Sequence, residues 1–357
     1  MSSSVGASRP PRRTALLVGI NYRGTENELN GCYNDVVNVS QYLRSVLGYA
    51  PGAISVLTDG NRGSAFPASV APTRQNILAG MAALVAGMVA GDEAVFHFSG
   101  HGTLVRDTNG DEATGLDSCL CPLDYNAPAS TGGGVVTDDE IRALLVNKVP
   151  RGARLYLILD CCHNGTGCDI RFKYEDFSIL LRPPSARTAP LWRTQQKAFA
   201  DGKYTETAGE VFMISGCRDE QTSADAYINN AFAGALTYAV FAILRANQAS
   251  IRTYSWSALL RDVRHFMRVN RYSQIPQLMT GQLITPARAV FAVAGAARGG
   301  TRSASSVLEL SSGASGVGGA GAREVSASDA PATLFSFYVK PKSGSKPTPR
   351  HCIQFLV

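Results

Sequence analysis

Short apolar runs alternate with longer segments of helical periodicity along the first half of the chain. The apolar runs span Ala15–Ile20, Ile54–Leu57, Ala94–Phe98 and Leu155–Leu159, and the helical segments span Glu28–Leu47, Thr73–Val89 and Asp138–Val146. Runs of this length and apolarity are typical of strands buried on both faces, and the segments between them fit crossover helices. The pattern therefore predicts an α/β fold with a mostly parallel central sheet that is flanked by helices on both faces.

The pattern changes in the second half of the chain. Residues 171–209 are basic and contain prolines without a clear apolar period, so we interpret them as a long exposed loop. A strand-like run and two helical segments follow, at Val211–Ser215, Ala231–Arg245 and Ser257–Val269. We divide the chain into a disordered leader (1–13), a large block (14–170), the exposed loop (171–209), a smaller block that completes the sheet (210–296), a Gly-, Ser- and Ala-rich disordered linker (297–331) and a tail (332–357).

Composition narrows the class of protein. Hydrophobic residues make up 45% of the 357 residues and charged residues 17%, with a net charge of +6, which indicates a globular protein and neither a polyelectrolyte nor a nucleic-acid coat. No apolar stretch is long enough to span a membrane, and no apolar segment of a secretory signal follows the first arginines. We therefore expect a cytoplasmic protein that binds neither nucleic acid nor membrane and keeps its eight cysteines as thiols.

Two of the predicted strands end in residues that carry chemistry. His101 follows one strand between Gly100 and Gly102, and Cys162 follows another. The carboxyl ends of parallel strands share one edge of a sheet, where ligands bind, so the imidazole and the thiol are expected to meet there. An imidazole beside a thiol makes a nucleophile. Taken singly, His101 reads as an ordinary loop histidine and Cys162 as a small buried side chain.

Five sequence blocks, in order, extend this picture over residues 14–280. They are ALLVGINYRG, GCYNDV, FHFSGHGT, LILDCCHNGT and SGCRDEQTSAD. Together they resemble the metacaspases, which are caspase-related cysteine peptidases. The resemblance implies a caspase-like fold, in which residues 14–170 form the large catalytic block and residues 210–296 the small one.

The resemblance implies a role for each residue of the dyad. His101 is expected to be the general base and Cys162 the nucleophile that forms an acyl-enzyme. The expected oxyanion hole consists of the backbone N–H groups of Gly102 and Cys162. Cys161 occupies a position that is usually serine, which leaves open that Cys161 reacts in place of Cys162.

The same resemblance implies a first substrate pocket that is acidic. Its expected residues are Cys32, Asp35, Ser99 and Asp160. Two carboxylates in a pocket favour a guanidinium or ammonium group and repel an aspartate, so we expect cleavage after Arg or Lys. Without the family, Asp35 reads as a turn acid and Asp160 as a strand-end residue bonded to backbone.

A further set of carboxylates matches the calcium-site positions of similar metacaspases. The set consists of Asp117, Asp138, Asp139 and Asp169. A hard cation takes oxygen ligands and relieves the repulsion among clustered carboxylates, so the expected cofactor is calcium. Asp138 and Asp139 also fit a helix N-terminus, and the two roles are compatible for Asp138. Structural zinc is a weaker alternative, because the Cys spacings lack paired C-x-x-C knuckles.

The sequence thus predicts a calcium-dependent cysteine endopeptidase that cleaves protein or peptide substrates after Arg or Lys. We expect a monomer that cleaves itself within residues 171–209, where Arg187, Arg193, Lys197 and Lys203 lie. The alternative is a non-proteolytic scaffold or aggregate-handling protein with the same fold, which uses the Gly-rich region and the tail for partners.

Overall fold

The structure is a computed structural model of the chain. It describes residues 9–60, 66, 69–110, 115–161, 168, 170–176, 192–196, 206–216, 225–228, 231–285, 287–291, 335–337 and 353–355. Its α-helices are α1 (Cys32–Ser45), α2 (Arg74–Val85), α3 (Asp138–Leu144), α4 (Ala235–Ala246) and α5 (Trp256–Val269). Its strands are β1 (Arg13–Gly19), β2 (Ile54–Thr58), β3 (Glu93–Ser99), β4 (Gly102–Arg106), β5 (Leu116–Leu120), β6 (Val136–Thr137), β7 (Arg154–Asp160), β8 (Phe172–Asp176), β9 (Trp192–Gln196), β10 (Glu210–Ser215), β11 (Asp225–Ile228), β12 (Ala231–Gly234), β13 (Gln277–Thr280), β14 (Phe335–Phe337) and β15 (Ile353–Phe355).

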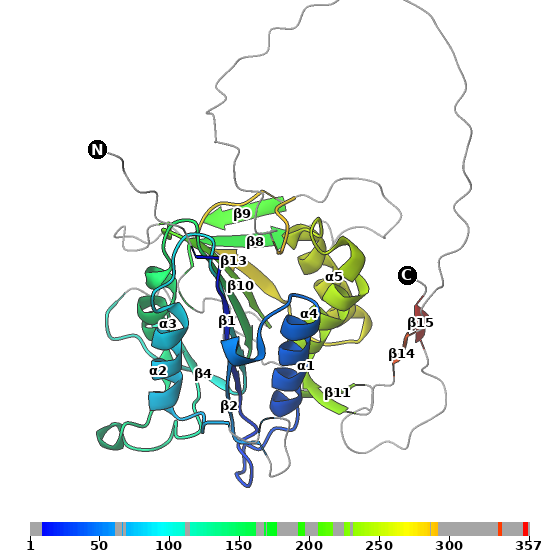
Figure 1. Cartoon of the computed structure of the whole chain (residues 1–357). Coiled ribbons are helices and arrows are strands. Elements are labelled where there is room, and N and C mark those ends of the chain that lie inside the picture. The colour runs from blue at the N-terminus through cyan, green and yellow to red at the C-terminus, as the bar shows by residue number, and fades with distance from the viewer. Residues whose placement is uncertain are drawn as a thin grey trace, which may run out of the picture.

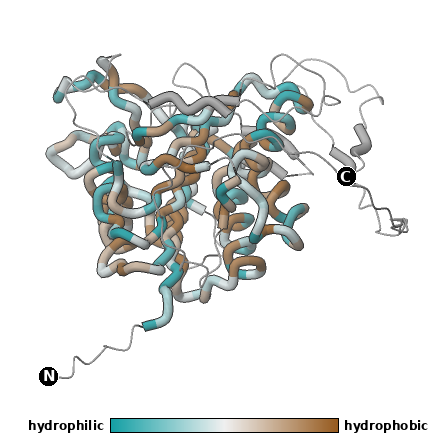
Figure 2. Tube along the Cα trace, turned by 90° about the horizontal axis from the view of Figure 1, so that it is seen from above, coloured by the Kyte–Doolittle hydropathy of each residue, from teal (hydrophilic) through white to brown (hydrophobic). Residues whose placement is uncertain are grey.

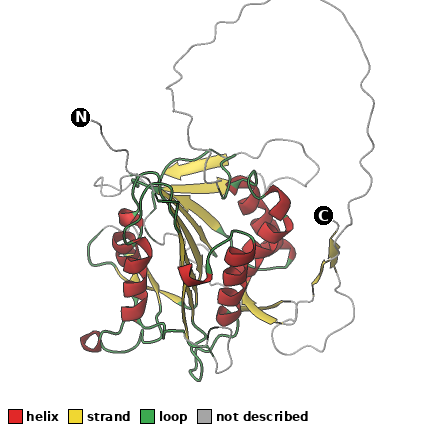
Figure 3. Ribbon diagram, viewed as in Figure 1, coloured by secondary structure: helices red, strands yellow, loops and turns green. Residues whose placement is uncertain are grey.

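An eight-stranded sheet forms the centre of the fold, in the order β2-β1-β3-β7-β10-β13-β8-β9. The first five strands run parallel, and β13, β8 and β9 each pair antiparallel with their neighbours. Helices α2 and α3 lie on one side of this sheet and α1, α4 and α5 on the other (Figures 1 and 3). The predicted fold class, a mostly parallel sheet between two layers of helices, is confirmed.

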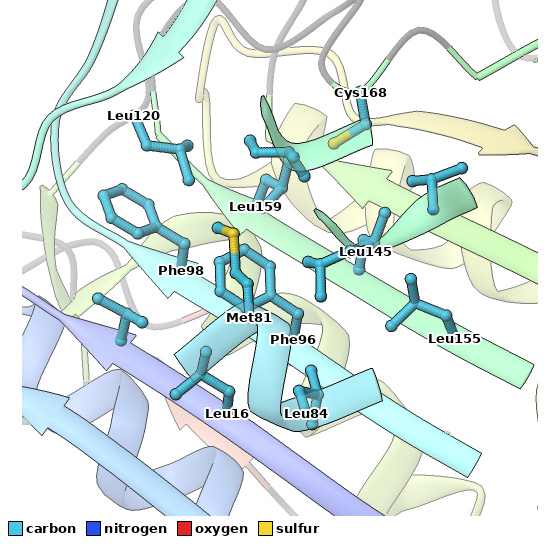
Figure 4. Packing of buried hydrophobic residues seen from close by; sticks show 14 of the residues in the cluster. Leu16, Met81, Leu84, Phe96, Phe98, Leu120, Leu145, Leu155, Leu159 and Cys168 are labelled. Carbon is cyan, nitrogen blue, oxygen red and sulfur yellow. The ribbon is translucent and has the colours of Figure 1, made fainter. Parts of the chain in front are cut away.

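Alternation along the strands builds a core on each face of the sheet. Leu16 and Phe96 pack with Met81 and Leu84 of α2, as Figure 4 shows from close by. The neighbouring strand positions, such as Leu17, face the opposite way and pack with α1, α4 and α5. Hydrophobic stretches accordingly run through the middle of the molecule in Figure 2. The two cores hold the strands in register.

That register brings three strand ends level. Gly19 at the end of β1 pairs with Ser99 at the end of β3, and Ser99 pairs with Asp160 at the end of β7. All three strands run parallel, so the residues that follow them emerge at one edge of the sheet. This is the edge at which the sequence predicts the dyad.

The predicted loop at 171–209 is wrong in part, because two of its segments form β8 and β9 and extend the central sheet. In β8, Phe172 and Tyr174 are buried and flank the half-buried Lys173. This alternation is typical of a strand with one buried face. The prolines that follow it favour a loop, which is why the sequence does not predict the strand. Helix α4 also begins later than expected, because residues 231–234 form β12, which pairs with β11.

Ordered contacts begin inside the predicted leader, and the predicted tail contains two short strands. Arg9, inside the predicted leader, already forms an ion pair with Asp92 at 2.5 Å, and β1 begins at Arg13. Within the predicted tail, 332–357, β14 and β15 pair with each other. The linker 297–331 lies outside the described residues. None of the helices in the described part of the chain is long and apolar enough to cross a membrane.

Candidate active site

His101 lies directly beyond β3 and is held by a backbone carbonyl. Its Nε2 lies 2.7 Å from the carbonyl oxygen of Asn27. A carbonyl oxygen only accepts hydrogen bonds, so Nε2 carries the ring proton and the neutral imidazole keeps Nδ1 as its basic nitrogen. The half-buried ring therefore has a defined orientation and a defined base atom.

Two buried carboxylates, Asp35 and Asp160, meet beside the first turn of α4. The Asp35 carboxylate accepts the Ser99 hydroxyl at 2.6 Å and the Gly234 N–H at 2.9 Å. The Asp160 carboxylate accepts the Thr237 N–H at 2.7 Å. The N–H groups at a helix N-terminus carry partial positive charge, which stabilises carboxylates held there.

Gly234 permits this meeting because it has no side chain. A Cβ atom at this position would overlap Oδ2 of Asp160 and would lie 2.7 Å from Oδ2 of Asp35. The same glycine is the N-cap of α4. Three of the four predicted pocket residues, Asp35, Ser99 and Asp160, are thus brought together here. The fourth, Cys32, is buried at the start of the helix that carries Asp35.

The alternative nucleophile, Cys161, belongs to the hydrophobic core. Its side chain is fully buried in the cluster that contains Leu159 and Cys168, on the α2 and α3 side of the sheet. Asp160, one residue earlier, faces α4 on the opposite side. This complete burial disfavours Cys161 as the nucleophile, because a substrate cannot reach its thiol. The predicted nucleophile, Cys162, lies outside the described residues.

Comparison of the sequence with those of known proteins shows which family the chain belongs to. The family model "Metacaspase, peptidase C14 domain" matches residues 13–171. Metacaspase-1 of Pyricularia oryzae is 36% identical over 295 residues, which cover 75% of this chain and 71% of that protein. The chain belongs to the metacaspase family. The family is one of cysteine peptidases, so the resemblance seen in the sequence is confirmed.

Two further comparisons show how much of the chain, and of its fold, other proteins share. Metacaspase-1 of Yarrowia lipolytica is 35% identical over 295 residues, and the match covers 75% of this metacaspase but 61% of that protein. The chain thus spans less than two thirds of the length of this relative. A solved structure of a protein from Geobacter sulfurreducens covers 78% of this chain and 96% of its own, with a TM-score of 0.51 and 23% identity. That likeness shows a shared fold.

Three of the four predicted calcium ligands, Asp117, Asp138 and Asp139, lie around the small sheet β4-β5-β6 of this metacaspase. Asp117 on β5 is buried, and Asp138 is buried at the start of α3, where its carboxylate accepts the Ser118 N–H at 3.0 Å. Asp139 is half-buried and accepts the Asn109 side-chain amide at 2.6 Å. Burial, and after it the nearby carboxylates of Asp138 and Asp117, raise the pKa of the Cys119 thiol.

These carboxylates provide the hard oxygen donors that calcium prefers. Within the described ranges, however, no three His, Cys, Asp or Glu side chains form a group that could hold a metal ion. Asp169 lies outside those ranges. The helix reading of Asp138 and Asp139 is confirmed, because α3 begins at Asp138 behind the Thr137 cap. The calcium site stays a prediction.

Sequence reasoning missed several residues that hold the site together. Asn27 supplies the carbonyl for His101, Thr237 supplies an N–H for Asp160, and the Tyr22 ring lies 4.7 Å from the His101 ring. Backbone donors and acceptors leave no mark in a sequence. Of these three residues, only Tyr22 lies in one of the five family-like sequence blocks, ALLVGINYRG, where an aromatic side chain just beyond a predicted strand indicates a residue near the site.

Proposed function

We propose that this metacaspase is a calcium-dependent cysteine endopeptidase that cleaves proteins after Arg or Lys. The observation that carries the proposal is the meeting of Asp35 and Asp160 at Gly234, at the sheet edge from which His101 emerges. A buried acidic pair close to a base of fixed tautomer suits recognition of a cationic side chain next to an attacked bond.

In the proposed reaction, His101 takes the thiol proton of Cys162 at Nδ1. The thiolate attacks the carbonyl carbon of the substrate, and His101 returns the proton to the leaving amine as the C–N bond breaks. A water molecule then gives a proton to His101 and attacks the thioester, the C–S bond breaks, and His101 returns the proton to the departing thiolate of Cys162. The carbonyl of Asn27 stabilises the imidazolium of the intermediate steps, because it accepts the Nε2 proton.

The strand pairing supports the proposed oxyanion donor Gly102. The neighbouring pair in the ladder, His101 and Cys121, is a hydrogen-bonded one, since Cys121 N–H donates to the His101 carbonyl at 3.0 Å. Hydrogen-bonded and non-hydrogen-bonded pairs alternate in antiparallel ladders, so the N–H of Gly102 opposite Leu120 points away from β5. It is therefore available to a developing oxyanion, together with the N–H of Cys162.

Calcium is proposed to bind Asp117, Asp138, Asp139 and Asp169. The support is the pair of buried carboxylates, Asp117 and Asp138, on adjoining elements whose oxygens suit a hard cation. When bound, the cation would neutralise charge among these acids. The proteolytic steps themselves use the dyad and backbone donors.

Self-cleavage and the monomeric state are also proposed. Of the basic residues in 171–209, Arg193 lies in β9, opposite Glu175 of β8. A chain paired in a sheet must first leave it to enter a protease, so we expect cleavage elsewhere in this segment. The second block places β13 inside the sheet, covered by β8 and then β9, which removes it as a pairing edge for a second copy.

The test is hydrolysis of matched fluorogenic peptides that end in Arg, Lys or Asp, with calcium or with a chelator. Calcium-dependent cleavage after Arg or Lys that disappears in Cys162→Ala, and persists in Cys161→Ala, is expected. Cleavage retained in Cys162→Ala would move the nucleophile. A well-folded wild-type protein that cleaves none of the peptides would overturn the proposal and favour a non-proteolytic role.

A further inference from the structure

The hydroxyl of Tyr22 is inserted into the end of a β-ladder. In the β4–β5 ladder, the pair beyond Gly102 and Leu120 is His101 opposite Cys121. The Cys121 N–H donates to the His101 carbonyl at 3.0 Å, as expected for a hydrogen-bonded pair. In the other direction, the His101 N–H donates to the Tyr22 hydroxyl at 3.0 Å, which donates in turn to the Cys121 carbonyl at 2.5 Å. The hydroxyl thus occupies the place of a direct backbone bond.

This insertion separates the backbone of His101 from that of Cys121. An N–H···O bond has a length of about 2.9 Å, whereas the hydroxyl bridge places an oxygen atom between the two groups. The direct bond on one side and the bridge on the other splay the ladder at His101. The orientation of the His101 backbone therefore depends on the Tyr22 hydroxyl as well as on the ladder bond to Cys121.

Tyr22 itself is held firmly in an unusual conformation. Its φ of 51° lies in the left-handed region, and its side chain is 1% exposed. The backbone N–H groups on either side, of Asn21 and Arg23, donate to the two carboxylate oxygens of Asp59 at 2.9 and 3.4 Å. Burial raises the pKa of Tyr22 well above its ordinary value, so the hydroxyl keeps the proton that it donates. A strained residue fixed by its surroundings is often found at functional sites.

The same tyrosine contacts both the backbone and the imidazole ring of His101. The Tyr22 ring lies 4.7 Å from the His101 ring, and Tyr125 meets the Tyr22 ring edge-on at 6.2 Å. The Tyr125 hydroxyl accepts the side-chain amide of Asn27 at 3.0 Å. The carbonyl of Asn27 accepts the His101 Nε2 proton. The backbone N–H of His101 is therefore bound by Tyr22 itself. The imidazole is bound by Asn27, whose side chain binds Tyr125, the aromatic neighbour of Tyr22.

Gly100 shows how closely the hydroxyl approaches this turn. A Cβ atom on Gly100 would lie 2.9 Å from the Tyr22 hydroxyl and 3.0 Å from the Phe98 ring. The glycine before the base is thus needed to leave room for the hydroxyl, which gives a physical reason for Gly100 in the SGHG motif.

We propose that Tyr22 is a positioning residue that sets the backbone and ring of His101 for proton transfer, a role that rests on the proposed function of His101 as the base. In Tyr22→Phe, the His101 N–H can approach the Cys121 carbonyl directly, and the imidazole moves with its backbone. A misplacement of about 1 Å costs on the order of a hundredfold in rate. The pocket formed by Asp35 and Asp160 is untouched, so substrate binding is unchanged.

The test compares Tyr22→Phe with Tyr42→Phe on the full chain. Tyr42 is a matched control because it is equally buried in α1 and its hydroxyl has no hydrogen-bond partner among the described residues. We expect kcat on an Arg peptide to fall about ten- to hundredfold in Tyr22→Phe with KM within about twofold, and Tyr42→Phe to match the wild type. A KM rise with unchanged kcat, or equal effects in both variants, would overturn the proposal.

A second readout does not depend on the peptide substrate. The rate at which iodoacetamide alkylates Cys162, followed by peptide mass spectrometry, reports the thiolate that His101 supports. We expect this rate to fall in His101→Ala and in Tyr22→Phe, and to be unchanged in Tyr42→Phe. A wild type that cleaves no peptide but shows this pattern would defeat the proposed specificity and uphold the role of Tyr22. A rate that depends on His101 but not on Tyr22 would overturn that role.

Gly100→Ala covers the case in which Tyr22→Phe does not fold. It keeps the hydroxyl, but the added Cβ would lie 2.9 Å from it, so the hydroxyl or the turn at Gly100 must shift. The same fall in kcat and in alkylation rate is expected, and wild-type values for both would contradict the proposal.

Discussion

Asp35 lies in α1 and Asp160 at the end of β7, yet both carboxylates bind the N-terminal turn of α4, Asp35 through the N–H of Gly234 and Asp160 through that of Thr237. Helix α4 belongs to the second block of the chain, whereas both acids belong to the first. The acidic pair therefore forms only when the two blocks are assembled, which makes α4 part of the site as much as of the core.

Gly234→Ala should disrupt this pair. The added Cβ overlaps Oδ2 of Asp160 and crowds Oδ2 of Asp35, so either the carboxylates or the helix must move. We expect a loss of about 1–3 kcal/mol in the free energy of unfolding, typical of overpacking, and a drop of at least about tenfold in kcat/KM on Arg peptides. Urea denaturation and peptide kinetics measure the two effects.

The matched control is Gly52→Ala, because a Cβ at Gly52 meets nothing within 4 Å. This variant should retain wild-type stability within about 0.5 kcal/mol and wild-type kinetics. If Gly234→Ala behaves like Gly52→Ala, the tight approach of the two carboxylates to the helix is incorrect.

His97 should make the fold sensitive to acid. It is fully buried on β3, its Nε2 lies 3.1 Å from the Thr237 hydroxyl, and burial lowers its pKa from 6.5 to about 3. Between these two values the unfolded chain binds a proton that the folded chain does not. The stability present above pH 6.5 is therefore lost as the pH falls toward 3, by about 1.4 kcal/mol per pH unit.

Comparison with His97→Gln isolates this contribution from that of the carboxylates. The free energy of unfolding of the wild type minus that of the variant should fall by about 2 kcal/mol between pH 7 and pH 5 in urea titrations. A difference that stays constant over this range would show that His97 takes up its proton equally in both states.

The strands that carry the site, and most of its acidic pocket, can be predicted from the sequence. Strand periodicity predicted β3 and β7 within about a residue, because strands buried on both faces leave continuous apolar runs. The resemblance placed Asp35, Ser99 and Asp160 in one pocket, and the structure joins them. It could not identify Gly234 as the meeting point, because a close approach of backbone to carboxylate depends on the assembly of both blocks.

Other features of the fold and the site cannot be predicted from the sequence, each for a specific physical reason. Strand β8 falls within the predicted loop because its alternation, with Phe172 and Tyr174 buried, is short and is followed by prolines. The carbonyl of Asn27 could not be found at all, since every residue carries one and only the folded loop selects it.

A ladder of charges across the amino ends of the strands should contribute measurably to stability. Glu93 on β3 binds Arg13 of β1 at 3.2 Å and Arg154 of β7 at 3.0 Å, and Glu210 on β10 continues the ladder to Arg154 and Arg288. The Glu93 side chain is 8% exposed. Glu93→Gln removes the charge between two arginines and should cost about 1.5–3 kcal/mol in the free energy of unfolding, the range for hydrogen bonds to charged groups.

An exposed ion pair provides the comparison for this ladder. Arg261 and Asp262 are 2.8 Å apart, with side chains 51% and 33% exposed, so solvent screens their attraction. Arg261→Gln should change stability by less than about 0.5 kcal/mol in the same urea titration. Equal effects of the two substitutions would mean that Glu93 gains nothing from its buried position.

Calcium affinity should depend on the two buried carboxylates beside β5. Asp138 already accepts the N–H groups of Ser118 and Asp139, which fixes its oxygens, and Asp117 precedes Ser118 in the strand. Asp117→Asn and Asp138→Asn each remove one negative charge from the proposed ligand set and should weaken calcium binding at least about tenfold in isothermal titration calorimetry. The exposed Glu206→Gln is the control and should bind as the wild type does. Unchanged affinity in both Asp variants would place any calcium elsewhere, and a wild type that binds no calcium would remove the cation from the proposed function while leaving the dyad and the acidic pair to be judged by peptide cleavage.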